Sequence, residues 1–381
     1  MKRLFILILL LSLVGYDRGF SPEERTPPPK TNLASSIYYV YMSPIGNDGG
    51  NGTPTSPLAT LAGVQNHLEA TRPDGDVVVR IRSDQGVYFD QTVIWSYHNP
   101  MDMESDEYNI SFEPYPDSLY ACFIGSNADT TFFILDRRDG KPTNVHFRKL
   151  SIRAYVHGTI WFCGNRAHAY GWNGYNSIDN CIFQDVGNFS QPEQNGCYGV
   201  LDFMNARYNI VRNCIFFNCA NANTQPYPQK EEAGMLDLAN LNAIVGIYLA
   251  HHSGNNYITE NTFQNIKGDP VRIRDVSNDN EICFNKFYKS GWAAICTMWY
   301  CHPNTADCLP TPDGLIDECP SYGTIFRNNK VEGNWICGLP RLFKDIDPNS
   351  KFGCSPNSEP RIQLYNNVST ECRGHVSASR S

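Results

Sequence analysis

The sequence lacks a long hydrophobic run beyond its amino terminus, so we expect no transmembrane segment. The apolar stretch from Leu4 to Val14 has 11 residues, fewer than the roughly 20 that a membrane-spanning helix needs. It follows Lys2 and Arg3, and a short apolar run behind basic residues is typical of a secretory signal. This predicts an exported protein that is secreted, periplasmic or held at the cell surface. Tyr16 stands where a bacterial lipid-anchor site needs Cys, which argues against a lipid anchor.

Positive charge is also scarce in the sequence. Lys and Arg total 31 against 39 Asp and Glu, which gives a net charge of −8. Binding to nucleic-acid phosphates usually requires a broad basic surface, so this balance argues against a nucleic-acid partner. An acidic protein can still hold an anionic ligand, but it must do so through a few local cations.

The 14 cysteines lack the paired CxxC spacing of a zinc site, and we assign no metal ligands. This number of cysteines suits an oxidising compartment, where disulfides form. Cys301, Cys308 and Cys319 lie in one Pro-rich insertion, where a disulfide is plausible. The spacing alone does not say which cysteines pair.

No internal linker interrupts the chain after its Pro-rich leader. We divide the chain into a signal peptide at residues 1–20, a leader at 21–35 and a single domain at 36–381. Length alone would allow two domains, but one repeat runs through most of the third segment. We expect this domain to be a monomer.

Six segments share a pattern in which Asn or Cys stands two residues before Phe or Val. The last residues of the pattern, which we call anchors, are Phe183, Phe216, Phe263, Phe287, Val331 and Val368. Their spacings are 33, 47, 24, 44 and 37 residues. A shortest period of 24, lengthened elsewhere by insertions, is typical of a β-solenoid in which each repeat is one coil. Short β-branched and aromatic runs bounded by Asn, Gly and Asp favour strands over helices.

The residues two before the anchors form a column of small side chains: Cys181, Cys214, Asn261, Asn285, Asn329 and Asn366. Stacked Asn amides at an inward turn can bond the backbone of the coils on either side. Cys, a small hydrophobic residue, can fill the same position in the first two coils. The column therefore predicts an internal side-chain ladder.

The amino-terminal part adds a helix to this pattern. Residues 38–48 lead into a short helix that is expected to end near Thr71, and residues 76–81 and 86–88 are expected to follow as strands. These segments and the repeats resemble the secreted β-helix polysaccharide-active proteins of the pectate-lyase-like superfamily. The resemblance implies an all-β fold, namely a right-handed parallel β-helix with a short amino-terminal capping helix and loop insertions. This fold hosts many chemistries, so the reaction must be argued from the site.

Two consecutive coils carry the densest group of candidate functional residues. Aligning residues 246–253 with residues 270–277 places Tyr248 and Arg272 in one outward column and Arg274 in the next. His252 would follow on the same face if its strand continued. Arginine grips carboxylates through two hydrogen bonds, and His or Tyr can transfer protons. We expect Arg272 and Arg274 to bind a uronate, with His252 or Tyr248 as the proton-transfer residue.

Five residues around this group are candidates for substrate binding: Lys267, Asp269, Asp275, Lys289 and Trp299. Long insertions at residues 187–198, 219–241 and 300–322 leave comparable points of their coils. Together they could wall an open groove over the sheet, and linear polysaccharides bind in such grooves.

Some of these residues also have a purely structural interpretation. The two arginines could pair with Asp269 and Asp275 as a solvated charge ladder. His251 and His252 would point to opposite faces of a strand, which argues against a metal shared by both. Trp299 could stack on a sugar or cover the core beneath an insertion.

The same two coils locally resemble the alginate lyase and chondroitinase B group. Residues 251–256 match the group's Lys-Ser-Ser-x-Asn turn with His252 at the Lys, and residues 273–275 match its Leu-Arg-His. The resemblance implies β-elimination with Arg274 at the group's Arg. It also makes Ca²⁺ a candidate cofactor, although the sequence assigns no calcium ligands.

We therefore predict a polysaccharide lyase that cleaves an acidic, uronate-containing glycan by β-elimination. Two alternatives stay open. A glycoside hydrolase would use a carboxylate pair, for which Asp202, Glu231 and Glu232 are candidates. A non-catalytic glycan-binding or surface protein would need only aromatic platforms.

Overall fold

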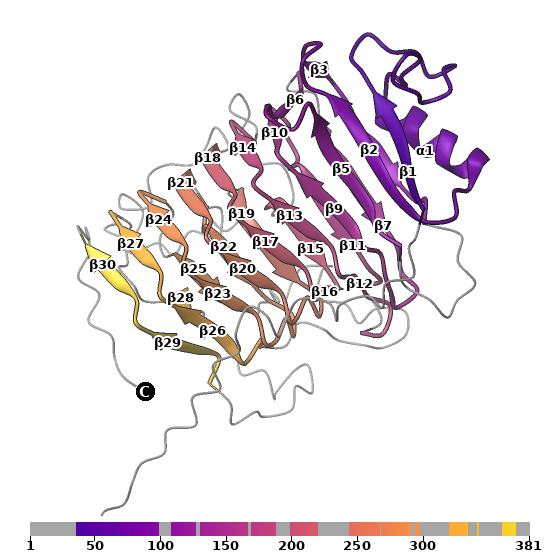
Figure 1. The fold of residues 1–381 in the computed structure, drawn as a ribbon. Coiled ribbons are helices and arrows are strands. Elements are labelled where there is room, and N and C mark those ends of the chain that lie inside the picture. Colours follow the sequence, from indigo (N-terminus) through magenta and orange to yellow (C-terminus); the bar gives the residue numbers. More distant parts are fainter. Residues whose placement is uncertain are drawn as a thin grey trace, which may run out of the picture. The chain divides into compact units, whose positions relative to one another are not determined.

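The protein is described by a computed structural model. Its described residues are 36–98, 108–126, 130–166, 169–187, 199–219, 244–266, 268–290, 294–297, 320–333, 341–342 and 360–370. Within these ranges the strands form three long sheets and one short sheet, and neighbouring strands are parallel (Figure 1). No helix in these ranges is long and apolar enough to cross a membrane.

Each sheet is described by its strands in spatial order. The ten-stranded sheet contains β1 (Ile37–Met42), β2 (Asp76–Arg82), β5 (Ile110–Tyr115), β9 (Val145–Arg148), β13 (Ser177–Asp179), β17 (Ile210–Arg212), β20 (Tyr257–Thr259), β23 (Glu281–Cys283), β26 (Thr324–Arg327) and β29 (Ile362–Tyr365). The nine-stranded sheet contains β3 (Tyr88–Phe89), β6 (Ala121–Ile124), β10 (Leu150–Arg153), β14 (Ile182–Gln184), β18 (Ile215–Cys219), β21 (Thr262–Ile266), β24 (Lys286–Tyr288), β27 (Lys330–Glu332) and β30 (Val368–Thr370). The eight-stranded sheet contains β4 (Val93–Trp95), β7 (Phe133–Asp136), β11 (Ile160–Cys163), β15 (Gly199–Met204), β19 (Val245–Ala250), β22 (Val271–Ile273), β25 (Ile295–Thr297) and β28 (Arg341–Leu342). The short sheet contains β8 (Lys141–Pro142), β12 (Asn173–Gly174) and β16 (Ala206–Arg207).

Consecutive strands of the chain belong to different sheets, and each strand pairs with its counterpart one coil later. Thus β13, β14 and β15 follow one another, and they pair with β17, β18 and β19 respectively. This connectivity is that of a parallel β-helix, and it confirms the predicted fold class. The right hand of the coil remains a prediction, as does the division of the chain at residues 20 and 35.

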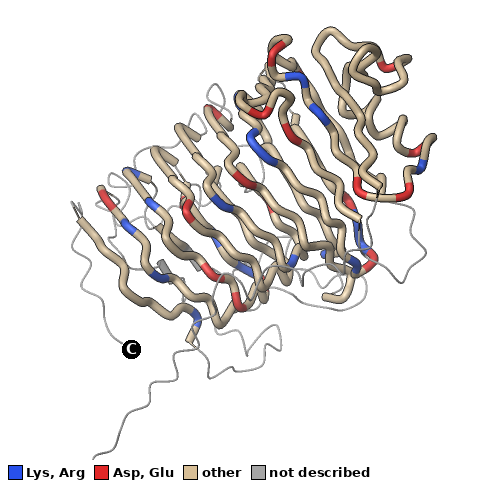
Figure 2. The backbone as a smooth tube through the Cα atoms, in the orientation of Figure 1, with Lys and Arg blue, Asp and Glu red and all other residues tan. Residues whose placement is uncertain are grey.

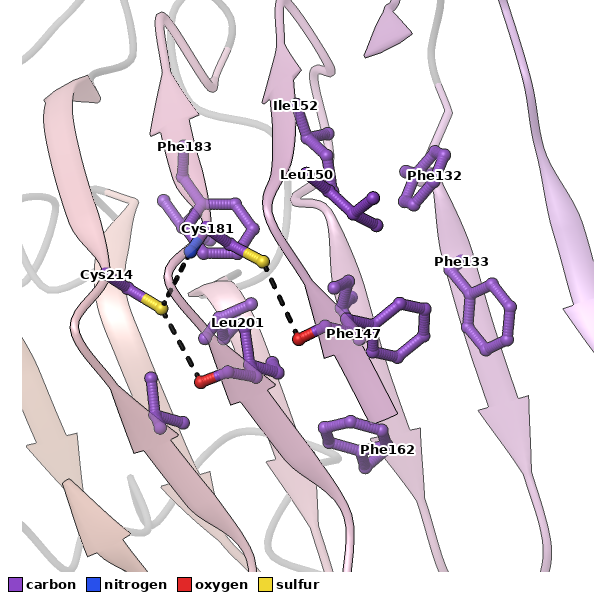
Figure 3. Close-up of a cluster of buried hydrophobic side chains, with 14 of the residues drawn as sticks. Phe132, Phe133, Phe147, Leu150, Ile152, Phe162, Cys181, Phe183, Leu201 and Cys214 are labelled. Atoms are coloured by element: carbon purple, nitrogen blue, oxygen red, sulfur yellow. Dashed lines mark hydrogen bonds between the residues drawn. The ribbon is translucent and has the colours of Figure 1, made fainter. Parts of the chain in front are cut away.

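Stacked aromatic side chains fill much of the core. The anchors Phe183, Phe216, Phe263 and Phe287 are in register on successive strands, with neighbouring ring centroids 5.0, 4.6 and 5.0 Å apart. They are almost completely buried. Figure 3 shows how Phe183 continues into a cluster of further Phe side chains from neighbouring coils. The anchor positions of the sequence repeat therefore supply core side chains of the solenoid.

The predicted side-chain ladder is present beside the anchors. The backbone N–H and the Nδ2 of Asn261 both donate to Oδ1 of Asn285, at 2.9 and 3.0 Å, and Nδ2 also donates to the carbonyl of Val211 at 2.9 Å. Each amide thus bonds the coils on both sides. Earlier in the ladder the backbone N–H of Cys181 donates to Sγ of Cys214 at 3.4 Å (Figure 3). Buried polar groups at this turn are satisfied, which is what burial demands.

The last coil is shifted by one residue from the predicted alignment. Asn329 donates to Oδ1 of Asn367 rather than of Asn366. Val331 pairs with Ser369, so the expected anchor Val368 is 57% exposed. Two adjacent Asn residues fit the pattern equally well in sequence, and a one-residue slip turns each side chain to the opposite face.

A second ladder, which we did not predict, lies where the chain enters the ten-stranded sheet. Asn176, Asn209, Asn256 and Asn280 bond one another in that order through Nδ2–H···Oδ1 contacts of 2.8–3.0 Å. The residue directly before each of these Asn residues has a left-handed backbone. We call these four preceding residues the corner column: Tyr175 (φ 60°), Tyr208 (φ 58°), Asn255 (φ 57°) and Asp279 (φ 58°). Asn and Asp tolerate this conformation, whereas bulky side chains rarely adopt it.

The expected amino-terminal helix is α1 (Leu61–Thr71), the one helix among the described residues, and it ends where predicted. Thr60 caps it by accepting from the Gly63 backbone N–H at 2.9 Å. Its apolar side packs beside β1 and β4 and joins the core through Leu61, Val64 and Leu68. Its predicted role as a cap of the core stays a prediction.

The outer face of the ten-stranded sheet carries a row of partly exposed ion pairs that was not predicted from the sequence. Glu113 of β5 lies between Arg80 of β2 and Arg148 of β9, at 2.9 and 3.0 Å, and Asp179 of β13 pairs with Arg212 of β17 at 3.1 Å. Figure 2 shows positive and negative residues following one another across successive strands. These partly exposed pairs keep the face polar, and each contributes little to stability.

Candidate active site

The predicted column of candidate residues is present on the eight-stranded sheet. Trp161 of β11, Asp202 of β15, Tyr248 of β19 and Arg272 of β22 are successive partners across parallel strands. Their neighbours in sequence, such as Leu249, belong to the main core. Because side chains alternate between the faces of a strand, the four residues of the column lie on the outer face. A carboxyl group, a phenol and a guanidinium therefore occupy three consecutive coils.

This column is not the open groove expected from the sequence. Asp202 is 0% exposed, Arg272 1% and Tyr248 6%. Tyr248 also forms a small apolar cluster with Val245 and Ala250, separate from the main core. The outer face of β19 is thus packed rather than solvated among the described residues.

Both arginines pair with aspartates, as the structural interpretation expected, but the pairs are not solvated. Nη2 of Arg272 lies 2.9 Å from Oδ2 of Asp269, and Nε of Arg274 lies 2.6 Å from Oδ2 of Asp275. Both aspartates are 0% exposed. Breaking such a buried pair by removing one partner typically costs about 3–5 kcal/mol. Arg274 is the more accessible arginine, with 18% of its side chain exposed.

His252 does not extend the outward face of β19, because that strand ends at Ala250. His251 and His252 both adopt left-handed backbone, with φ of 53° and 66°, and form a turn. The backbone N–H of His252 donates to the carbonyl of Asp275 at 2.8 Å. His251 is the buried member, with Nδ1 3.5 Å from Oδ2 of Asp275.

Asp275 consequently joins the two candidate catalytic residues. Its side chain contacts Arg274, and its carbonyl holds the turn that carries His252. His252 is partly exposed, as Arg274 is. The structure therefore places two partly exposed residues, His252 and Arg274, at the same end of two neighbouring strands.

Asp202 has the most perturbed acid–base chemistry of the column. Burial raises the pKa of its carboxyl well above the usual range, and the hydrogen bond from the Gly199 N–H at 2.9 Å opposes this only in part. Its Oδ2 is buried without a hydrogen-bond partner in the structure. A carboxyl group whose pKa is raised by burial keeps its proton to higher pH than an exposed Asp does, which is the property a proton donor needs.

The remaining predicted site residues lie elsewhere or outside the described ranges. Lys289 follows β24 of the nine-stranded sheet, where its ammonium lies 4.9 Å from the Tyr288 ring centroid. It does not join the arginine cluster on β22. The predicted residues Lys267, Trp299, Glu231 and Glu232 lie outside the described residues.

An aromatic group that was not predicted from the sequence lies beside β12 and β16. The rings of Tyr175 and Tyr208 are stacked 5.1 Å apart at 16°, and Trp172 lies 5.8 Å from Tyr208 and 6.1 Å from Tyr175. The run of alternating aromatic and small residues from Tyr170 to Tyr175 is the signal that could have drawn attention to it.

No group of three or more His, Cys, Asp or Glu in the described ranges is arranged to hold a metal ion. The cysteines whose side chains are described are all free thiols: Cys122, Cys163, Cys181, Cys214, Cys219 and Cys283. Burial raises the pKa of the Cys163 thiol to about 12. Cys181, Cys214, Cys219 and Cys283 are buried, and the disulfide expected among Cys301, Cys308 and Cys319 falls outside the described residues.

Fold and site together define a parallel β-helix with a histidine- and arginine-bearing turn at the end of its eight-stranded sheet.

No protein-family model matches the sequence, and neither does any curated protein. Among solved structures it is similar to an alginate lyase from Paenibacillus sp. str. FPU-7, with 10% identity, a TM-score of 0.40, and coverage of 72% of this chain and 74% of the lyase. A rhamnogalacturonan lyase has 14% identity and a TM-score of 0.38, with coverage of 78% and 69%. A GH136 lacto-N-biosidase from Eubacterium ramulus has 13% identity and a TM-score of 0.37, and this chain spans 56% of its length. Likenesses at this level assign no reaction to the chain.

Proposed function

We propose that this protein is a polysaccharide lyase that cleaves a uronate-containing glycan at the turn formed by residues 251–254. The observation that carries the proposal is the joining of Arg274 and His252 through Asp275. The Arg274 pair is 2.6 Å and the His252 backbone bond is 2.8 Å. Both residues are partly exposed, next to a face whose other residues are packed.

Arg274 would neutralise the uronate carboxylate. Elimination removes the proton on C5, next to this carboxylate, and negative charge builds up on its oxygens as the enolate forms. A guanidinium fixed in advance stabilises that charge without rearranging during the reaction. Asp275 supplies the fixing, because it is fully buried and contacts Arg274 through Nε.

His252 would take the C5 proton. As the C5–H bond breaks, its electron pair forms the C4–C5 double bond, and the C4–O4 bond breaks in turn. The departing O4 must then receive a proton. Protonated His252 can return this proton to O4, whereas Tyr248, the proton-transfer alternative expected from the sequence, is only 6% exposed on the packed face. A neutral imidazole suits the base role near pH 7.

The buried Asp269–Arg272 pair supports the site from behind rather than touching substrate. Arg272 is 1% exposed and Asp269 is 0% exposed. The pair holds β22 in place next to Arg274. We accordingly assign Arg272 and Asp269 to positioning, a narrower role than the substrate contacts expected from the sequence.

The test follows absorbance near 235 nm, where the unsaturated product absorbs, during incubation with alginate, pectate, glucuronan, chondroitin sulfate or dermatan sulfate. Each polymer is tried with and without Ca²⁺. We expect at least one polymer to give a rise. Arg274→Gln and His252→Asn should each reduce its rate by about 100-fold or more. Asn is chosen for His252 because it tolerates the left-handed backbone there.

The matched control is Arg212→Gln, which removes a half-exposed arginine from the ten-stranded sheet. It should cleave as fast as the wild type. If no polymer gives a rise, or if the two site variants retain full rate, the lyase proposal is wrong.

Hydrolysis is the second candidate, and Asp202 favours it. A glycoside hydrolase needs one protonated and one ionised carboxyl group. Asp202 has a raised pKa, whereas Asp269 and Asp275 are paired with arginines. The signature would be new reducing ends without absorbance at 235 nm, abolished in Asp202→Asn. The complete burial of Asp202 is the reason that this candidate ranks second.

A polymeric substrate of this kind is met outside the cytoplasm. The predicted signal peptide at residues 1–20 therefore agrees with the proposed activity, and we propose a secreted or surface location for the protein.

A further inference from the structure

We infer that Trp172, Tyr175 and Tyr208, which we call the aromatic platform, form a glycan-binding subsite next to the His252 turn. Their rings come from two consecutive coils, on either side of β12 and just after β16. Tyr208 is 41% exposed, and Trp172 and Tyr175 are partly exposed. The inference deepens the proposed function, on which its assignment to a substrate subsite rests.

The geometry of the platform suits sugar rings. Tyr175 and Tyr208 are nearly parallel, with a 16° interplanar angle, and Trp172 stands across Tyr208 at 75°. The platform thus presents aromatic faces in two orientations, one from the parallel tyrosine rings and one from the Trp172 ring. The C–H-rich faces of pyranose rings pack against such aromatic faces, while their hydroxyls remain at the edge to form hydrogen bonds. Exposed aromatic groups of this kind mark binding sites more often than chance would allow.

The backbone makes a structural explanation of the two tyrosines weak. Both occupy the left-handed corner column, where the next coils carry Asn255 and Asp279. Left-handed backbone recurs at other turns of the solenoid with bulky residues such as Val276 and Phe284, so Tyr is tolerated at these corners but is not required by them. Asn would turn the corner at lower cost. The turn itself therefore does not require an aromatic ring at either position.

The corner column also supplies a polar continuation of the platform. The backbone N–H of Tyr208 donates to the carbonyl of Gly254, which directly precedes Asn255. Coils in a parallel ladder are spaced by about 4.8 Å. Asn255 and Asp279 thus follow the two tyrosines at regular intervals, and their side chains are of the type that bonds sugar hydroxyls.

One residue connects the platform to the candidate active site. Arg207 directly precedes Tyr208, and its Nε donates to the carbonyl of His252 at 3.0 Å. Its Nη2 bonds the carbonyl of Ala169, three residues before Trp172. The platform and the His252 turn are therefore contiguous. A polysaccharide whose glycosidic bond is cleaved beside His252 would extend across Tyr208. The substrate is therefore a polymer that occupies several subsites, not a single sugar.

The experiment measures binding separately from cleavage. Affinity electrophoresis is run in gels that contain alginate, pectate, glucuronan, chondroitin sulfate or dermatan sulfate. We expect at least one polymer to retard the wild-type protein. Tyr208→Asn and Trp172→Ala should each weaken that binding by about fivefold to tenfold. The Asn variant keeps the residue type found at position 255 of the same column, so the fold of the corner is preserved.

Tyr39→Ala is the matched control, because Tyr39 is 44% exposed on β1, at the edge of the ten-stranded sheet. It should bind as the wild type does. The subsite is refuted if no polymer retards the wild type, or if both platform variants bind normally. Loss of binding in the platform variants without any absorbance at 235 nm would keep the subsite and reject the lyase. Loss of cleavage in His252→Asn with retained binding would support both.

Discussion

Asp202 shows how the chemistry of one residue depends on what covers it. In sequence it is an ordinary acidic residue within a β-strand pattern. In the structure it is 0% exposed, one of its oxygens has no hydrogen-bond partner, and burial raises the pKa of its carboxyl. Its proton is therefore retained in the folded protein at pH values where the unfolded chain has lost it.

This linkage predicts a pH-dependent stability. Below the ordinary Asp pKa of about 4, both states hold the proton and the group costs nothing. As pH rises from there toward the raised pKa, only the unfolded state ionises freely, so the free energy of unfolding falls. Asp202→Asn has no ionisation and should escape this loss. Thermal denaturation from pH 4 to 8 should show the variant gaining in Tm relative to the wild type as pH increases. Parallel curves would contradict the assignment.

Substitutions of Asn285 measure how much one amide of the ladder contributes to the stability of the fold. Its Oδ1 accepts both donors of Asn261, and its Nδ2 donates to Ile258 and Asn329. Asn285→Ala leaves these buried groups unsatisfied and should lower the free energy of unfolding by about 2–4 kcal/mol in urea titrations. Asn285→Cys should lose less, because Cys occupies the equivalent position at residue 214. The control is Gln264→Ala on the partly exposed outer face of β21, with an expected change within about 0.5 kcal/mol.

At the scale of the elements, the nine-stranded sheet separates a packed inner face from an accessible outer one. Phe263 lies between Phe216 and Phe287, with centroids 4.6 and 5.0 Å away, and is 0% exposed. Phe217 is the next residue after Phe216 and is 36% exposed. The same residue type therefore has opposite packing on alternate positions of the sheet.

Truncation of these two rings should have unequal effects. Phe263→Ala leaves a cavity in the stack and should cost about 3–5 kcal/mol of stability. Phe217→Ala should cost about 1 kcal/mol or less, because its ring is partly solvated. Chemical denaturation of both variants makes the comparison. Equal losses would contradict the register of β18 and β21.

At the scale of the whole molecule, the coils are coupled mainly to their neighbours. Such a solenoid does not distribute its stability evenly, and coils with less burial open first. β30 is exposed throughout and β29 partly so, whereas Ile258 and Phe263 of the central coils are buried. The structure therefore predicts a gradient of stability along the solenoid.

Native-state hydrogen exchange should reveal that gradient. Amides of β29 and β30 should exchange at least about tenfold faster than those of β20 and β21 under conditions where opening is local. Mass spectrometry of peptic fragments can compare the four strands directly. Uniform protection would mean that the coils unfold as a single cooperative unit.

The repeat, the strands and the helix end near Thr71 could all be predicted from local pattern. A period of 24 or more residues, with Phe at one position, requires only that equivalent residues meet in the core, and stacking of coils enforces this. The final coil was predicted one residue out of register, because Asn366 and Asn367 satisfy the same pattern. The pairing of Tyr248 with Arg272 also followed from alternation alone.

The environment of the candidate site could not be predicted from the sequence. Strand alternation says which residues face outward, but it does not say whether that face is covered; Arg272 and Asp202 are buried there. It also does not say where a strand stops: His252 would have stayed on the outward face only if its strand continued, and the strand ends at Ala250, so His252 lies in a turn. The aromatic platform likewise needed the structure, because Trp172 and Tyr208 come from different coils.

The parallel β-helix could be read from the amino acids alone, since repetition specifies contacts between neighbours one coil apart. Burial, turn geometry and the meeting of Arg274, Asp275 and His252 depend on contacts that no repeat encodes. Those features are set only when the coils stack and the chain leaves each strand at a particular residue.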